Sequence, residues 1–168
     1  MKAILIKLFF MSSVCLFMTA NASTLYDDSI NRGINETCSS YLDQIEKSYG
    51  INGLNITFAH PENPSQLPSL HIASQKFNNG SSFFSATLSP DEDFCYVSSI
   101  LVTSVNNQSC LNITRIKTEA NPDLKVTTFS DGGYTILTPP DQGYQVILTS
   151  SSNTGCTMSE IRMMWPGR

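Results

Sequence analysis

The clearest hydrophobic pattern lies in residues 29–49, where apolar side chains recur every three or four positions. On a helix they form one stripe, made of Ile30, Ile34, Cys38, Tyr41, Leu42, Ile45 and Tyr49. Asp28 or Ser29 can cap the start of this helix, and Gly50 suits the left-handed position after its end. Gly33 weakens the first turn, so the helix can begin later. The pattern predicts an amphipathic helix that buries one face.

After residue 50 the hydrophobic period shortens to two, which indicates β-strands. The predicted strands cover residues 54–58, 70–77, 82–88, 111–116, 124–129, 134–138, 144–149 and 157–165. Residues 60–68 contain three prolines and are predicted to be an irregular connection. In the first strand Leu54, Ile56 and Phe58 alternate with polar residues, so we expect a half-buried strand with these three side chains inside.

Residues 89–92 have the sequence Ser-Pro-Asp-Glu, which is typical of a helix start. Ser89 and Glu92 have the spacing of a capping box, and proline is favoured at the first helical position. We therefore predict a short helix over residues 90–103, with a strand as the alternative because the segment is rich in β-branched residues. A calcium loop at the acidic residues Asp91, Glu92 and Asp93 is less favoured than capping, because such loops space their oxygen ligands and usually include a glycine turn.

These elements predict a single α+β domain. In it, an N-terminal amphipathic helix packs on an antiparallel β-sheet, and a second short helix and two disulfides complete the fold. The chain of 168 residues has no internal repeat and no linker long enough to separate two domains.

Residues 1–22 have the three parts of a signal peptide. Lys2 and Lys7 form a basic start, an apolar run follows at 8–19, and Ala20 and Ala22 supply small residues for cleavage. We predict cleavage after Ala22, which leaves residues 23–168 as an exported domain in the periplasm or outside the cell. The apolar run is too short to span a bilayer comfortably, so no membrane span is expected after cleavage.

Four cysteines remain after removal of the segment that contains Cys15: Cys38, Cys95, Cys110 and Cys156. An even number of cysteines in an exported chain predicts two disulfides, and three ways of pairing them are open. None of the four belongs to a Cys-x-x-Cys motif or a Cys/His cluster, so neither a metal site nor a redox site is expected.

The remaining composition points away from catalysis. With 10 basic and 14 acidic residues the net charge is −4, which excludes a binder of nucleic acid that relies on a basic face. The two histidines, His60 and His71, lie in the proline-rich connection and in a predicted strand, and neither accompanies a recognisable nucleophile motif. We expect no enzyme activity, no cofactor and no catalytic residue.

The layout resembles the globular domain of type IVb pilins. The resemblance rests on the helix through Tyr41, Leu42, Ile45 and Tyr49, on residues 83–89, and on Cys95 and Cys156 near the chain end. It implies that Cys95 pairs with Cys156 and Cys38 with Cys110. Pilins keep a long hydrophobic N-terminal helix, whereas the apolar segment of this chain is predicted to be removed.

Two functions follow as expectations. The first is a structural, adhesive or assembly component of a cell-envelope apparatus, similar to a pilin. The second is a periplasmic or secreted inhibitor or immunity protein that binds a cell-wall-degrading enzyme. In that case Asp91, Glu92 and Asp93 would lie near a basic cleft of the enzyme. In both functions the binding partner is another protein.

Overall fold

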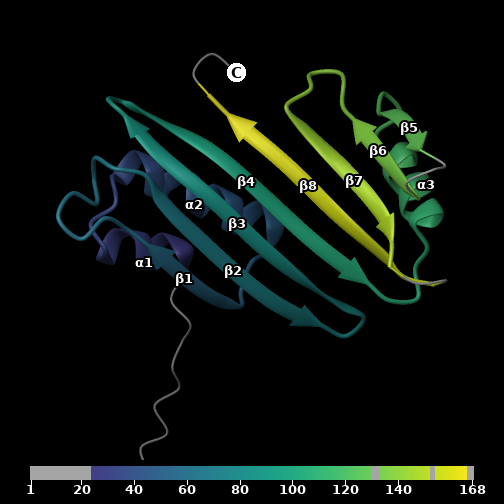
Figure 1. Cartoon of the computed structure of the whole chain (residues 1–168), viewed down its shortest axis with the longest axis horizontal. Coiled ribbons are helices and arrows are strands. Elements are labelled where there is room, and N and C mark those ends of the chain that lie inside the picture. Colours follow the sequence, from purple (N-terminus) through teal and green to yellow (C-terminus); the bar gives the residue numbers. More distant parts are fainter. Residues whose placement is uncertain (1–23, 130–132, 152–153, 166–168) are drawn as a thin grey trace, which may run out of the picture.

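The computed structural model describes residues 24–129, 133–151 and 154–165, which form an α+β fold with one large antiparallel sheet. The sheet order is β1-β2-β3-β4-β8-β7-β6-β5. Its strands are β1 (Leu54–Phe58), β2 (Ser69–Phe77), β3 (Gly80–Asp91), β4 (Phe94–Val105), β5 (Lys125–Phe129), β6 (Tyr134–Thr138), β7 (Tyr144–Ser150) and β8 (Cys156–Met164). The helices α1 (Leu25–Asn31), α2 (Glu36–Tyr49) and α3 (Cys110–Ala120) all lie behind the strands in the view of Figure 1. The predicted signal peptide, residues 1–22, lies outside the described residues.

Two helices occupy the place of the single helix predicted over residues 29–49. The chain turns at Gly33, whose φ of 76° is left-handed, and Asn35 then caps α2 by accepting hydrogen bonds from two backbone amides. The predicted end is confirmed, since Gly50 adopts the left-handed conformation after α2. Glu46 of α2 holds α1 in place, because its carboxylate accepts hydrogen bonds from the amides of Leu25 (2.5 Å) and Tyr26 (3.2 Å).

The predicted helix over residues 90–103 is wrong, and the strand alternative is what the structure shows. β3 and β4 pair antiparallel from Gly80–Val105 to Asp91–Phe94, so the capping-box residues lie at the end of a hairpin. The chain reverses through Glu92, whose φ is 49°. A long ladder of backbone hydrogen bonds outweighs a local capping preference, which contributes only about 1 kcal/mol.

The predicted strand over residues 111–116 is also wrong, because this segment is part of α3. Ser109 caps the helix by accepting a hydrogen bond from the amide of Asn112. Leu111 and Ile113 were expected on one face of a strand, yet Leu111 is 81% exposed while Ile113 is buried. A segment this short fits either period, so its pattern does not distinguish a strand from a helix.

The helices divide the covered side of the sheet into two cores. The core between the sheet and the helices α1 and α2 contains Leu25, Leu42, Phe84, Leu88 and Val97, and the core between the sheet and α3 contains Ile113, Leu137, Val146 and Leu148. The disulfide Cys38–Cys95 joins α2 to β4 in the first core, and Cys110–Cys156 joins α3 to β8 in the second. The opposite side of the sheet, which faces the viewer in Figure 1, carries no helix of the described residues.

Candidate functional site

The four predicted disulfide cysteines are all paired, although not as the pilin resemblance implies. Cys38 bonds to Cys95 and Cys110 to Cys156, instead of Cys95 to Cys156 and Cys38 to Cys110. The bonds therefore fasten each helical layer to the strand beneath it. Because both thiols of each pair are used, these cysteines are not nucleophiles. Two disulfides are consistent with an exported protein.

His71 lies in the first core rather than in an accessible site. Its side chain is fully buried, and its ring nitrogens form hydrogen bonds with Thr57 Oγ1 (3.1 Å) and Ser69 Oγ (2.8 Å). Burial lowers the pKa of His71 to about 4, with Asp28 acting in the opposite direction and Arg32 in the same direction. The imidazole is thus neutral at pH 7 and holds the strands β1 and β2 together.

His60 has a different structural task, in the connection between β1 and β2. Its Nδ1 accepts hydrogen bonds from the backbone amides of Glu62 (3.3 Å) and Asn63 (3.2 Å), so it shapes this turn. Asp91, Glu92 and Asp93 are exposed at the tip of the β3–β4 hairpin, where no helix begins. Within the described part of the chain, no cluster of three His, Cys, Asp or Glu side chains could hold a metal ion.

A cluster around Arg162 links three segments that are far apart in the sequence. Arg162 Nη2 donates to Glu160 Oε1 (2.8 Å), and the hydroxyl of Tyr49 donates to the same oxygen (2.5 Å). The guanidinium carbon lies 5.1 Å from the ring centre of Tyr144 and 5.9 Å from that of Tyr49. Burial, and then the bond to Glu160, raise the pKa of Tyr49. This cluster fixes the end of α2 to β8 and β7.

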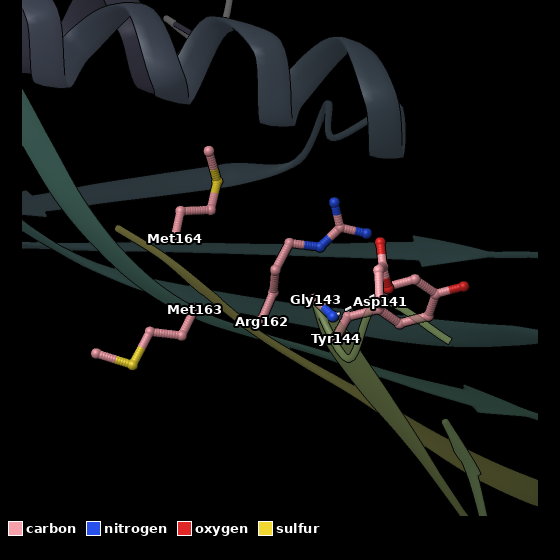
Figure 2. Close-up of a pocket in the computed structure, with 6 residues that line it drawn as sticks. All are labelled: Asp141, Gly143, Tyr144, Arg162, Met163 and Met164. Atoms are coloured by element: carbon pink, nitrogen blue, oxygen red, sulfur yellow. Dashed lines mark hydrogen bonds between the residues drawn. The ribbon is translucent and has the colours of Figure 1, made fainter. Parts of the chain in front are cut away.

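A pocket of about 510 Å³ opens beside this cluster. Its lining residues are Asp141, Gly143, Tyr144, Arg162, Met163 and Met164 (Figure 2). Arg162 and Met164 point toward the helical side, whereas Met163 points away from it. The amide of Gly143 donates to Asp141 Oδ1 (3.0 Å), which shapes the turn at the pocket rim. The lining holds one cation and one carboxylate, and it includes no histidine, serine or cysteine that could act as a base or nucleophile.

The side of the sheet without a helix, called the open face below, is the second candidate. It is defined by the strand residues whose side chains share this side, among them Leu54, Ile56, Phe58, Leu70, Ile72, Phe83, Tyr96, Ile100, Phe129, Tyr134, Ile136, Ile147, Ile161 and Met163. Several of these side chains are far from buried, including Leu54 (66%), Phe58 (55%) and Met163 (54%). Polar side chains such as Ser85, Ser98 and Ser159 share this side, so the open face combines exposed apolar residues with the polar residues usual on the solvated face of an antiparallel sheet.

The strand β1 corrects the expectation for Leu54, Ile56 and Phe58. Their alternation with polar residues is as predicted, but all three lie on the open face, and the buried residue is Thr57. Thr57 lies on the side of β1 that α1 covers, where its hydroxyl meets His71. Periodicity separates the two sides of a strand, but it does not tell which side a helix will cover.

Two hollows interrupt the open face. One, of about 400 Å³, lies at the end of β1 and β2 and is lined by Phe58, Leu67, Leu70 and Thr87, among others. The second, of about 150 Å³, lies between the ends of β7 and β8 and includes Gln145, Ile161 and Trp165. Both hollows include side chains of the open face, and both also include residues of the adjoining connections.

No family model matches the chain, and no curated protein or solved structure matches it significantly. The surfaces themselves therefore have to indicate the function. Among the three helices of the described residues, none has the length and apolar character needed to cross a membrane.

Neither candidate was visible in the sequence as a site. Tyr49, Tyr144 and Arg162 belong to three distant segments, and no spacing rule connects them. The open face has one local sign, the strict alternation in residues 54–58, but such alternation is equally typical of a face that a helix covers. The open face is the larger of the two candidates.

Proposed function

We propose that the chain is a non-catalytic exported protein that binds other proteins through its open face, as a structural, adhesive or assembly component of a cell-envelope apparatus. The observation that carries the proposal is the row of exposed apolar side chains on this face, such as Leu54, Phe58 and Met163. Large apolar side chains that stay exposed together on one face of a soluble protein indicate a site of protein association.

Two further features support this proposal. The disulfides Cys38–Cys95 and Cys110–Cys156 suit a compartment outside the cytoplasm, either the periplasm or the exterior. The sequence layout also resembles that of type IVb pilins, which are structural subunits of an envelope filament. His71 and the four cysteines, the side chains with the greatest chemical reactivity, serve the interior of the fold.

The test is a pull-down from a cross-linked envelope fraction, read by mass spectrometry. The variant Phe58→Lys/Ile161→Lys places two charges on the open face, and Leu111→Lys/Ile116→Lys places the same charges on exposed positions of α3. We expect envelope assembly components with the wild type and the α3 variant, but not with the open-face variant. Equal recovery with all three proteins would contradict the proposal.

A second candidate function is inhibition of a cell-wall-degrading enzyme, favoured by the acidic tip of the β3–β4 hairpin. Asp91, Glu92 and Asp93 are exposed there on a projecting turn, as insertion into a basic cleft requires. For this function we expect the pull-down to yield a single hydrolase. The variant D91N/E92Q/D93N should then lose it, while the open-face variant should retain it.

A further inference from the structure

We propose that the occupant of the open face is a second copy of this chain, packed face to face as a two-sheet sandwich. The inference rests on the proposed function, because it names the partner of the same face. It is carried by the size of the face, by its lack of charge, and by the positions of its large side chains.

The area of the face matches what a stable dimer needs. The sheet is eight strands wide, with strands of five to twelve residues. With about 4.8 Å between strands, about 3.3 Å per residue and a mean strand of about eight residues, the face measures about 1,000 Å². A standard stable interface buries about 800 Å² on each partner. A second copy therefore covers the face at standard interface size even if the twist of the sheet leaves about a fifth of it open.

The charges of the face permit contact with an identical surface. Among the strand residues described, only Lys76, Asp91 and Lys125 bring a charge to this side, and each lies at or next to the end of its strand. The middle of the face carries neutral side chains, among them Ser85, Ser98 and Ser159. When two identical faces pack together, a charged residue near the two-fold axis lies opposite the same residue of the other copy, and the two repel. A neutral centre avoids this repulsion.

The large side chains also lie where a two-fold arrangement can use them. One flank of the face carries Leu54, Ile56 and Phe58 on β1, and the other carries Phe129 and Tyr134 on β5 and β6, with ring centres 4.9 Å apart. A two-fold axis along the strands places β1 over β5 of the second copy, and an axis across the strands places β1 over β1. In both cases large apolar side chains meet across a sandwich about 10 Å thick.

The centre of the sheet supplies a specific probe. Ile100 of β4 and Ile161 of β8 are register partners on the two middle strands, and Ile161 is 41% exposed on the open face. Under either two-fold axis Ile161 lies close to its own equivalent in the second copy. Two sheets about 10 Å apart are too far for a direct disulfide at this position, so a single cysteine there should instead be joined to its equivalent by a short thiol-reactive cross-linker.

The experiment measures the oligomeric state of the processed protein, purified after export of the full chain, by sedimentation equilibrium from 1 to 100 μM. We expect a dimer, an Ile161→Lys variant with a dissociation constant raised at least tenfold, and a Leu111→Lys control that dimerises like the wild type. A bismaleimide that spans about 10 Å should join two copies of Ile161→Cys and leave Leu111→Cys, on exposed α3, without a cross-link. Near-UV circular dichroism reports whether each variant is folded. If Ile161→Lys does not fold, the cross-linking of Ile161→Cys tests the dimer instead.

The outcomes separate this inference from the proposed function. A wild type that stays monomeric at 100 μM, with no more cross-link at residue 161 than at residue 111, overturns the second copy as occupant. If Phe58→Lys/Ile161→Lys nevertheless loses the envelope components, the proposed function stands with a different protein on the open face. If the chain dimerises through this face and the envelope recovery is unchanged, the dimer stands and the proposed function fails.

Discussion

His71 lies beneath α1 with a hydroxyl on each side of its ring, and no carboxylate bonds to it. The hydroxyls of Thr57 and Ser69 can each donate or accept, so they satisfy the neutral imidazole in either tautomer. Because the ring is buried, its positively charged form is costly, and the pKa falls from 6.5 to about 4. A histidine in this environment contributes to stability only while it remains neutral.

This pKa predicts a loss of stability between pH 6.5 and pH 4. Over this range the unfolded chain binds a proton that folded His71 does not, so the free energy of unfolding falls as the pH falls. The lowered pKa of His71 corresponds to a loss of about 3 kcal/mol in the free energy of unfolding. Urea unfolding at pH 7, 5.5 and 4 should show this loss in the wild type, and His71→Gln should show a loss smaller by about that amount.

The control for His71 is His60→Gln. His60 is exposed in the connection between β1 and β2, so its replacement tests the loss of a histidine without disturbing the buried ring of His71. If His71→Gln and the wild type lose the same free energy of unfolding on acidification, the buried histidine is not the group that titrates.

Residue-scale features were predictable where they are local. Gly50 at the end of α2 is confirmed, and the ion pair of Asp43 and Lys47, whose charged atoms lie 2.7 Å apart, has a spacing that a helix brings together. Both depend on residues at most one helical turn away. The contact of Tyr49 with Glu160, which fixes the end of α2 to β8, spans 111 positions. Its geometry exists only after the sheet has formed, so the sequence does not contain it as a pattern.

At the scale of elements, strand pairing decides what local signals leave open. Ser89 and Pro90 have every local feature of a helix start, yet they pair with Tyr96 and Cys95 in a β hairpin. Residues 110–120 form a helix because Ser109 caps them and Cys110 ties their first turn to β8. A single sequence shows propensities and caps, but the partner of a strand depends on the whole sheet.

The disulfide Cys110–Cys156 should decide whether α3 stays on the sheet. Ile113 is the one buried side chain of this helix, so its packing alone is weak. The bond spans 46 positions, for which the chain-entropy model gives about 4 kcal/mol. In Cys110→Ala/Cys156→Ala we expect a lower melting temperature and much faster hydrogen exchange over residues 110–120, measured by mass spectrometry.

The matched comparison is Cys38→Ala/Cys95→Ala, whose bond spans 57 positions. Its entropic contribution is similar, again about 4 kcal/mol. However, α2 also buries Leu42 and holds α1 through Glu46, so exchange in α2 should increase less than in α3. Unchanged protection of residues 110–120 without Cys110–Cys156 would show that packing alone retains α3.

At the scale of the whole molecule, one sheet carries two separate cores. The α+β class, the antiparallel sheet and the two disulfides follow from alternating strands and an even cysteine count. The division into two cores does not follow, because it depends on α3, whose segment was predicted as a strand. The open face has the same origin: three helices cover one side of eight strands, and nothing in the alternation of Leu54, Ile56 and Phe58 reveals which side.

Two cores on one sheet predict two regions of different stability. Leu137 is fully buried in the core under α3, and Phe84 is 1% exposed in the core under α2. Truncation of a buried side chain to alanine lowers the free energy of unfolding by about 2–5 kcal/mol for a leucine and by about 3–5 kcal/mol for a phenylalanine. In Leu137→Ala we expect faster hydrogen exchange in α3, β6 and β7, while β2 and β3 keep their protection. Phe84→Ala should instead increase exchange in α1, α2 and β1–β4.

The strand pairing of β4 with β8 determines whether the two cores respond separately to these substitutions. These two strands join the cores by nine residue pairs, from Val97–Met164 to Val105–Cys156, and each disulfide anchors one of them. If the pairing couples the cores fully, Leu137→Ala and Phe84→Ala will raise exchange uniformly over the chain. If each core responds alone, the region under α3 can open while the half of the open face on β1–β4 keeps its shape. Exchange at β3 in Leu137→Ala distinguishes these results, because β3 contacts only the first core.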